Sequence, residues 1–224
     1  MIIALDGPAA AGKGTLGRRL ADHFGFAYLD TGKLYRAIGL KVLRANGDLD
    51  DPQQALDAAK SLKPEDLNDP AIVGDEAAAA ASRVAGFEAA REALRQFQRN
   101  FAASPPNGAT GAILDGRDIG TVICPDANIK IFITADLETR ARRRHKELLE
   151  RREPSIYARV LRNMGERDTR DSTRAVAPLI PADDAYLLDT EALDADAAFA
   201  AAIAHIDAQS VPIASSKTTW RTKA

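Results

Sequence analysis

Residues 7–15 combine small residues with one lysine in a pattern suited to holding a phosphate chain. They read Gly-Pro-Ala-Ala-Ala-Gly-Lys-Gly-Thr, after a short apolar run and before helix-forming sequence. Glycines allow close approach and turn successive amides inward, and the following helix N-terminus attracts an anion. Lys13 adds a full positive charge. The spacing predicts a phosphate-binding loop for ATP, contacted by Gly7, Pro8, Ala9, Ala10, Ala11, Gly12, Lys13, Gly14 and Thr15.

The loop departs from the general Gly-x-x-x-x-Gly-Lys-Ser/Thr pattern at one position. Gly14 follows the lysine, and a hydroxyl group comes one residue later at Thr15. We therefore assign Thr15 to the surroundings of the phosphates and Mg²⁺. Asp115, which ends an apolar run, is a second candidate that could hold Mg²⁺ through water, and its alternative role is to structure its own loop.

A phosphate loop alone does not separate kinases, GTPases and motor ATPases. No Asn-Lys-x-Asp base reader of a guanine-nucleotide switch occurs in the chain. Transfer to a second substrate requires acceptor residues elsewhere, and three segments offer them. These are residues 30–36 (Asp-Thr-Gly-Lys-Leu-Tyr-Arg), residues 115–121 (Asp-Gly-Arg-Asp-Ile-Gly-Thr) and residues 167–174 (Arg-Asp-Thr-Arg-Asp-Ser-Thr-Arg).

Each of these segments has its own chemistry. Thr31 stands at a predicted helix N-terminus with Arg36 about one turn later, which suits an acceptor phosphate but also fits an ordinary helix cap. Arg117 and Asp118 follow a buried strand and fall on an irregular loop. In the third segment, helical spacing places residues 167, 171 and 174 on one face of a helix. Taken alone, this run of charged residues would indicate a solvent-exposed helix.

Short apolar runs alternate with helical segments along the chain. Strands are expected at residues 2–5, 26–29, 111–114, 129–133 and 185–188, and a helix is expected from Lys13 to residue 23 or 24, ending at Gly25. This alternation predicts an α/β fold with a parallel sheet covered by helices on both faces. Active sites of such sheets lie at the carboxyl ends of strands, where Asp6, Asp30 and Thr134 are expected together with Asp115.

The chain divides into a core and an insertion. Residues 1–36 and 111–208 are assigned to the core, with an Arg-rich lid at about 140–175. Residues 37–110 are Ala-rich, broken by prolines and without a long strand candidate, and are predicted to form an inserted helical subdomain. Residues 209–224 are polar and without periodicity, which predicts a disordered tail.

Composition limits the classes of partner. A net charge of −2 gives no bulk field for nucleic acid or an anionic membrane, so an anion must be held by a local cluster such as the arginines of residues 140–174. The single cysteine, Cys124, excludes an internal disulfide, and we expect it to be a small buried residue. This use of cysteine favours a reducing compartment. No leader or membrane span is visible. We expect a cytoplasmic protein, and a chain of this size needs no oligomer for stability, so a monomer is expected.

Taken together, the four motifs resemble those of the bacterial cytidylate kinases, nucleoside monophosphate kinases of the phosphate-loop class. Gly-Pro-x-x-x-Gly-Lys-Gly-Thr, Asp-Thr-Gly-x-x-Tyr-Arg, Asp-Gly-Arg-Asp-Ile-Gly-Thr and Arg-Asp-x-Arg-Asp-x-x-Arg-Ala-Val-Ala-Pro occur in the family's order, and the resemblance covers residues 1 to about 208. It implies transfer of the terminal phosphoryl group of ATP, with Mg²⁺, to CMP or dCMP. Two departures are the short insertion and Val73, where the resemblance leads us to expect a β-rich subdomain ending in an arginine.

The resemblance also implies roles for individual residues. Thr31, Arg36, Arg117 and Arg174 would hold the CMP phosphate, Ser82, Arg91 and Asp118 would read cytosine, and Arg167 and Asp171 would hold the sugar. Lys13, Arg143 and Arg174 would stabilise charge during transfer, with Arg143 chosen over its neighbours Arg140 and Arg144 in the lid. Rival interpretations are a kinase for adenylate, uridylate or shikimate, and a regulatory protein that binds ATP without transferring phosphate.

Overall fold

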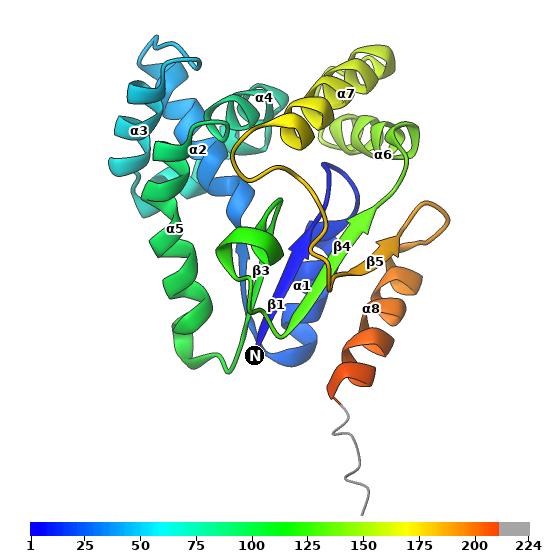
Figure 1. Cartoon of the computed structure of the whole chain (residues 1–224). Coiled ribbons are helices and arrows are strands. Elements are labelled where there is room, and N and C mark those ends of the chain that lie inside the picture. Colours follow the sequence, from blue (N-terminus) through cyan, green and yellow to red (C-terminus); the bar gives the residue numbers. More distant parts are fainter. Residues whose placement is uncertain (211–224) are drawn as a thin grey trace, which may run out of the picture.

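The five predicted strands are present and form one parallel sheet. In the computed structural model, which describes residues 1–210, the strand order is β2-β3-β1-β4-β5. The strands are β1 (Ile2–Asp6), β2 (Ala27–Asp30), β3 (Ala112–Gly116), β4 (Ile129–Thr134) and β5 (Tyr186–Asp189). Each begins and ends within two residues of its predicted bounds. The central strand β1 leads into residues 7–15, so the phosphate loop begins in the middle of the sheet (Figure 1).

Alternating side chains of β1 enter two different apolar layers. Ile3 and Leu5 pack with Leu20 of α1 (Lys13–Phe24) and Ile206 of α8 (Ala195–Ser210). Ala4 packs on the other side, with the end of α5 (Glu88–Ala103) and the turn after β3. Both faces of the sheet are therefore covered, which confirms the predicted fold class.

Helix α1 begins and ends as predicted. Gly25 follows its last residue with a left-handed φ of +66°, and its amide bonds back to the carbonyl oxygen of Ala21. At the other end Gly12 supplies no side-chain cap. The first amides of α1 therefore remain oriented toward the phosphate loop.

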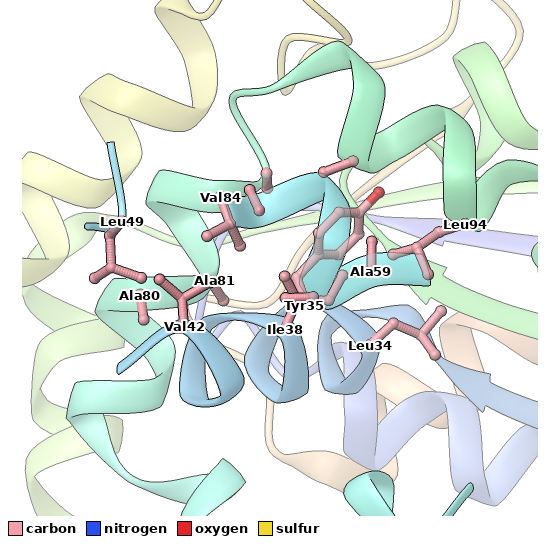
Figure 2. Packing of buried hydrophobic residues seen from close by; sticks show 14 residues of the cluster. Leu34, Tyr35, Ile38, Val42, Leu49, Ala59, Ala80, Ala81, Val84 and Leu94 are labelled. Atoms are coloured by element: carbon pink, nitrogen blue, oxygen red, sulfur yellow. The ribbon is translucent and has the colours of Figure 1, made fainter. Parts of the chain in front are cut away.

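Residues 31–108 contain helices and no strand, as predicted. Besides α5, they form α2 (Thr31–Arg44), α3 (Pro52–Lys60), α4 (Asp75–Val84) and the short turns η1 (Pro64–Asn68), η2 (Pro70–Val73) and η3 (Pro106–Gly108). Figure 2 shows their shared core, in which Ile38 and Val42 of α2 meet Ala80 and Val84 of α4. Helix α2 runs without a break through residue 36, so the proposed insertion is attached to the core by a continuous helix.

Two helices form a hairpin above the carboxyl ends of the strands (Figure 1). These are α6 (Leu137–Glu150) and α7 (Tyr157–Thr173). Leu148, Val160 and Met164 make their joint core, and Ala9 and Ala10 of the phosphate loop pack against it. The hairpin therefore lies directly over the loop.

The tail prediction was wrong at its first two residues. Residues 209 and 210 belong to α8, because the helix continues to Ser210. Residues 211–224 lie outside the described part of the chain. Within residues 1–210, no helix combines the length and the apolar character needed to cross a membrane.

Candidate active site

A cavity of about 970 Å³ opens at the carboxyl ends of β2 and β3, between the phosphate loop, the insertion and the α6–α7 hairpin. Residues from all four predicted motifs line it. Every residue expected at the acceptor is on its wall, namely Thr31, Arg36, Ser82, Arg91, Arg117, Asp118, Arg167, Asp171 and Arg174. Lys13, Thr15, Asp115 and Arg143 line the same cavity. The fold thus gathers residues from distant parts of the sequence around one space.

The backbone of the phosphate loop requires glycine at its start. Gly7 has a φ of +145°, and a Cβ atom there would lie 2.0 Å from the carbonyl oxygen of Ile133 in β4. Gly12 has a φ of +101°, but a Cβ atom there would meet open space, so backbone conformation alone selects glycine at this position. The loop therefore sits tightly on the sheet at one end and is open at the other.

Three carbonyl oxygens of the loop are bonded to side chains of the protein. Lys13 Nζ donates to Pro8 O at 2.8 Å, Arg140 Nη1 to Ala9 O at 3.3 Å, and Thr190 Oγ1 to Ala11 O at 3.0 Å. A loop whose carbonyl groups are held in this way can turn its amides toward phosphate oxygens. Thr190, directly after β5, is a residue that sequence reasoning missed.

Lys13 and Asp115 form a buried pair beneath the loop. Lys13 Nζ lies 3.9 Å from Asp115 Oδ1, and Tyr28 donates its hydroxyl proton to Asp115 Oδ2 at 3.0 Å. Burial and the neighbouring Arg117 lower the pKa of Lys13 to about 7, and Asp115 opposes them. Burial raises the pKa of Asp115, and Lys13 opposes this. A bound anion would favour the charged form of Lys13, so a phosphate ligand would stabilise the charge that burial disfavours.

The oxygen donors near the loop fit a magnesium ion that arrives with a nucleotide. Thr15 is exposed and lines the cavity, and a Cβ atom at Gly14 would lie 3.6 Å from Asp115 Oδ2, which places that carboxylate beside the loop. Among residues 1–210, no three His, Cys, Asp or Glu side chains form a metal-binding group. Mg²⁺ in kinases takes few protein ligands and completes its shell with water and phosphate, so this donor set is sufficient.

The predicted acceptor-phosphate residues are held at the start of α2 and after β3. Asp30 caps α2 by accepting from the amide of Lys33, and its Oδ2 accepts from Arg36 Nη2 at 2.8 Å. Thr31 is the first helical residue rather than the cap, and its hydroxyl donates to the carbonyl oxygen of Asp115 at 2.8 Å. Helix α2 is therefore tied to the end of β3, beside Arg117.

Three arginines on this wall keep buried N–H groups for which residues 1–210 provide no hydrogen-bond partner. These groups are Arg36 Nε, Arg167 Nε and Arg174 Nη2. Arg167 Nε also lies 3.7 Å from Asp171 Oδ2, which is an ion pair but too long for a hydrogen bond. Burial and the neighbouring Arg117 lower the pKa of Arg167 to about 10, and burial and Arg91 lower the pKa of Arg174. Crowded, desolvated cations with unused donors are strongly complementary to a phosphate group.

Arg91 of α5 and Asp118, which follows β3, form a buried ion pair. Arg91 Nη2 donates to Asp118 Oδ2, and each residue is 4% exposed. The guanidinium group of Arg91 also lies over the ring of Tyr35, 5.3 Å from its centroid. The pair presents a donor and an acceptor side by side at the cavity wall, as an amino-pyrimidine edge requires.

Asp171 connects α7 with two other elements. Its Oδ1 accepts from Ser82 of α4 at 2.9 Å, and its Oδ2 accepts from Arg117 Nε at 3.2 Å. Arg170 Nη1 also donates to the Ser82 hydroxyl at 3.1 Å. Burial opposes ionisation of Asp171, but Arg117, Arg167 and Arg174 lower its pKa. Ser82 is thus engaged with α7 in this structure, in addition to lining the cavity.

Three of the four arginines of α6, those at positions 140, 143 and 144, are the lid candidates, and they occupy different places. Arg140 is 5% exposed, donates to Asp168 Oδ2 at 2.6 Å and is absent from the cavity wall. Arg143 donates to both the hydroxyl and the carbonyl group of Thr190. Arg144 lines the large cavity and donates to Asp75 Oδ1 at 2.6 Å. The geometry therefore gives Arg140 a supporting position and leaves Arg143 and Arg144 at the site.

A second cavity of about 260 Å³ adjoins the first at the outer side of the phosphate loop. Gly12, Thr15 and Arg143 line both cavities. The other wall comes from the segment between β5 and α8, with Thr190, Leu193 and Asp194, and from the start of α8, with Ala195 and Ala198. This segment is not among the site residues predicted from the sequence. The feature that could have indicated it is its position directly after the last strand, because the carboxyl ends of parallel strands lie at the same edge of the sheet as the other motifs.

Val73 occupies the place at which the resemblance predicts an arginine. Its side chain is 38% exposed, and its carbonyl oxygen accepts from Arg144 Nη2 at 3.2 Å and from Arg151 Nη1 at 3.3 Å. Arg144 of α6 and Arg151 directly after it thus reach across to the backbone of the insertion. The α6–α7 hairpin is therefore linked to η2 through Val73 and to α4 through Ser82.

Comparisons with known proteins agree with the geometry. The family model described as cytidylate kinase matches residues 3–208. A cytidylate kinase of Paramagnetospirillum magneticum is 60% identical over 90% of this chain and 95% of its own length, and one of Rhodospirillum rubrum is 54% identical over 91% and 95%. The crystal structure of an uncharacterized protein from Eubacterium ventriosum covers 92% of this chain and 98% of its own, with a TM-score of 0.52 and 19% identity, and supports the fold alone. The chain belongs to the cytidylate kinase family.

Proposed function

We propose that this enzyme transfers the terminal phosphoryl group of ATP to CMP or dCMP, giving ADP and the nucleoside diphosphate. The observation that carries the proposal is the wall of the large cavity, where unused donors of Arg36, Arg167 and Arg174 lie with the buried Arg91–Asp118 pair. The donors of Arg36 and Arg174 suit a monophosphate, that of Arg167 suits the adjoining sugar, and the pair suits cytosine. An ATP sensor without transfer activity has no need of this second, phosphate-complementary wall.

The donor nucleotide binds at the phosphate loop. Its phosphates lie against the Lys13 ammonium group and the backbone amides of residues 7–15, except Pro8, which has no N–H. Its base enters the smaller cavity beside Leu193 and Ala198. Arg143 lies where the two cavities meet and supplies positive charge near the transferred group. Mg²⁺, held by Thr15 and through water by Asp115, supplies further charge neutralisation on the phosphates when bound.

The acceptor nucleotide binds between the insertion and the core. Its phosphate is held by Thr31, Arg36, Arg117 and Arg174. Asp118 accepts from the exocyclic amine of cytosine, Arg91 donates to the carbonyl and ring nitrogen, and Ser82 completes the base site. Asp171 and Arg167 hold the sugar. Uracil presents a carbonyl group in place of the amine. Its oxygen and the Asp118 carboxylate are both hydrogen-bond acceptors, so no hydrogen bond could form between them.

The transfer needs alignment and charge stabilisation more than covalent chemistry. The acceptor phosphate is already an anion at neutral pH, so no general base is required. Lys13, Arg143 and Arg174 stabilise the charge spread over the transferred group. Residues 140–175 act as a lid and residues 37–110 as the monophosphate-binding subdomain, and their approach excludes water from the reacting groups.

The cellular setting follows from the proposed reaction. A (d)CMP kinase serves pyrimidine nucleotide metabolism, and its substrates are small and soluble. We place the enzyme in the cytoplasm as a monomer that acts without nucleic acid or membrane partners.

The test is production of ADP from ATP and Mg²⁺ against CMP, dCMP, UMP, AMP, GMP and shikimate. CMP and dCMP are expected to give the highest kcat/KM. A higher value with another acceptor would overturn the roles of Ser82, Arg91 and Asp118. ATP binding without acceptor-dependent ADP release would favour a sensor and overturn the kinase assignment.

A further inference from the structure

The turn that carries Asp118 has an unusual backbone. Residues Ile119–Ile123 form a single π-helical turn directly after Asp118. The amides of Val122 and Ile123 both donate to the carbonyl oxygen of Asp118, at 2.9 and 3.1 Å. Such turns are rare and are frequent at functional sites, and their geometry depends on support from neighbouring elements. The support here comes from two residues outside the cavity.

Asp6 of β1 holds the beginning of the turn. Its Oδ1 accepts from the amide of Ile119 at 2.8 Å, and its Oδ2 accepts from the amide of Gly120 at 2.7 Å. The residue is 6% exposed and does not line the large cavity. Both carboxylate oxygens are therefore committed to the two amides that follow Asp118.

Arg99 of α5 holds the end of the turn. Its Nε donates to the carbonyl oxygen of Ile123 at 3.0 Å, and its Nη2 donates to that of Val122 at 3.0 Å. Arg91, the partner of Asp118, is on the same helix about two turns earlier. Helix α5 thus contacts Asp118 with one arginine and the end of its turn with another.

An apolar contact completes the support. Ile119 and Ile123 are buried in a cluster with Ala4 of β1, Leu114 of β3 and Ala102 of α5. The side chains of the turn are fixed between sheet and helix, and its backbone groups are fixed by Asp6 and Arg99. The position of the Asp118 carboxylate is consequently determined from both ends.

We propose that Asp6 and Arg99 are positioning residues that hold the turn after Asp118 and thereby set the preference for cytosine over uracil. The inference rests on the proposed function. Neither residue touches the base in this arrangement, because neither lines the cavity. They act through the orientation of Asp118, whose hydrogen-bond geometry distinguishes an amine from a carbonyl group.

The test compares kcat/KM for CMP and UMP in Asp6→Asn and Arg99→Gln. Asn offers one acceptor and places an NH₂ group against an amide donor, and Gln loses one of the two donors that reach the turn. Each change is expected to lower the CMP-to-UMP ratio about tenfold, as loss of one charge-assisted hydrogen bond would. The KM for ATP is expected to stay at its wild-type value. Arg95→Gln is the matched control, because Arg95 lies on the same helix and pairs with Glu92 of that helix.

A double-mutant cycle with Asp118→Asn separates positioning from general stability. If Asp6 and Arg99 act through Asp118, adding either change to Asp118→Asn lowers the ratio by less than about twofold further. An unchanged ratio in Arg99→Gln, or equal losses with both acceptors, overturns the inference. Should Asp6→Asn fail to fold, Arg99→Gln decides alone. A wild-type enzyme that does not prefer CMP would instead overturn the proposed function.

Discussion

The hydroxyl group of Ser82 on α4 donates a hydrogen bond of 2.9 Å to Oδ1 of Asp171 on α7. Both residues are 3% exposed, and 89 positions of sequence separate them. The bond joins the proposed monophosphate-binding insertion to the proposed lid. It therefore gives Ser82 a second task beside that of lining the base site: to hold the carboxylate that is assigned to the sugar.

Replacing Ser82 by alanine tests this task. Asp171 would keep Arg117 and Arg167 but lose its hydroxyl donor, so we expect the KM for CMP to rise about fivefold with little change in the KM for ATP. Unfolding free energy should fall by about 1 kcal/mol. Ser172→Ala is the control, because Ser172 is exposed and bonds to the carbonyl group of Thr169 on its own helix. Equal effects of the two changes would contradict the assignment.

The Lys13→Ala enzyme should fold normally and transfer phosphate poorly. The Lys13 ammonium group serves the phosphates, whereas its burial beside Arg117 penalises its charge in the folded protein. We expect kcat to fall by about a thousandfold or more, because charge stabilisation in a water-excluded site is lost. Thermal unfolding followed by circular dichroism and a coupled ADP assay measure the two effects. Turnover near that of the wild type would refute the role of the loop.

The sheet and the phosphate loop could be predicted because they depend on local sequence. Short apolar runs such as Ile129–Thr134 are typical of buried strands, and a lysine between glycines after such a run is typical of a phosphate loop. The left-handed Gly25 ended α1 as expected. The acceptor residues came from motif resemblance, and the structure brings all of them to one cavity.

The contacts that complete the site could not be predicted, because they join distant elements. Nothing near Thr190 in the sequence indicates that its hydroxyl reaches Ala11, and nothing near Val73 indicates that its carbonyl group meets Arg144. The π-helical turn at Ile119–Ile123 has no sequence signature, since it depends on Asp6 at the end of the neighbouring strand β1. The bond from Arg140 to the carbonyl oxygen of Ala9 in the phosphate loop likewise joins residues far apart in the sequence.

Asp118→Asn should weaken discrimination between acceptors. An amide can place either a donor or an acceptor toward the base, so it tolerates the carbonyl group of uracil where a carboxylate does not. We expect the CMP-to-UMP ratio of kcat/KM to fall by about a hundredfold. ADP release measures it under conditions in which the wild type and the variant are both fully folded. Asp168→Asn serves as the control, because Asp168 pairs with Arg140 away from the base site. A ratio that stays constant would remove Asp118 from base recognition.

Gly7→Ala should destabilise the fold far more than Gly25→Ala. Both glycines have positive φ values, but a Cβ atom at Gly7 would lie 2.0 Å from Ile133 O, whereas Gly25 has open space. We expect a loss of more than about 4 kcal/mol for Gly7→Ala and about 1 kcal/mol for Gly25→Ala in urea unfolding. Similar losses of unfolding free energy in the two variants would show that the backbone of β4 shifts to make room for the added Cβ atom.

The stability of the protein should depend on pH through the buried Asp6. Burial raises its pKa from 3.8 to about 6, although the amides of Gly120 and Ile119 oppose the shift. Among charged groups, Asp118 raises this pKa further and Lys13 lowers it. Because the folded-state pKa is the higher one, the folded protein binds more protons than the unfolded chain between these values. The stabilising contribution of Asp6 is therefore complete below about pH 4 and is lost as the pH rises through 6.

Comparison with Asp6→Asn isolates this contribution, because the amide does not titrate. The unfolding free energy of the wild type, relative to the variant, should fall by at most about 3 kcal/mol between pH 4 and pH 6.5. Urea denaturation at a series of pH values measures the difference. Asp66→Asn provides the opposite case, since bonds from the amide of Lys63 and from the Lys41 side chain lower the pKa of Asp66. The unfolding free energy of the wild type relative to Asp66→Asn should therefore stay constant above about pH 5. A wild type that gains stability over Asp6→Asn as the pH rises would mean that Asp6 is stabilised as a carboxylate, and its two amide bonds would then outweigh the cost of burial.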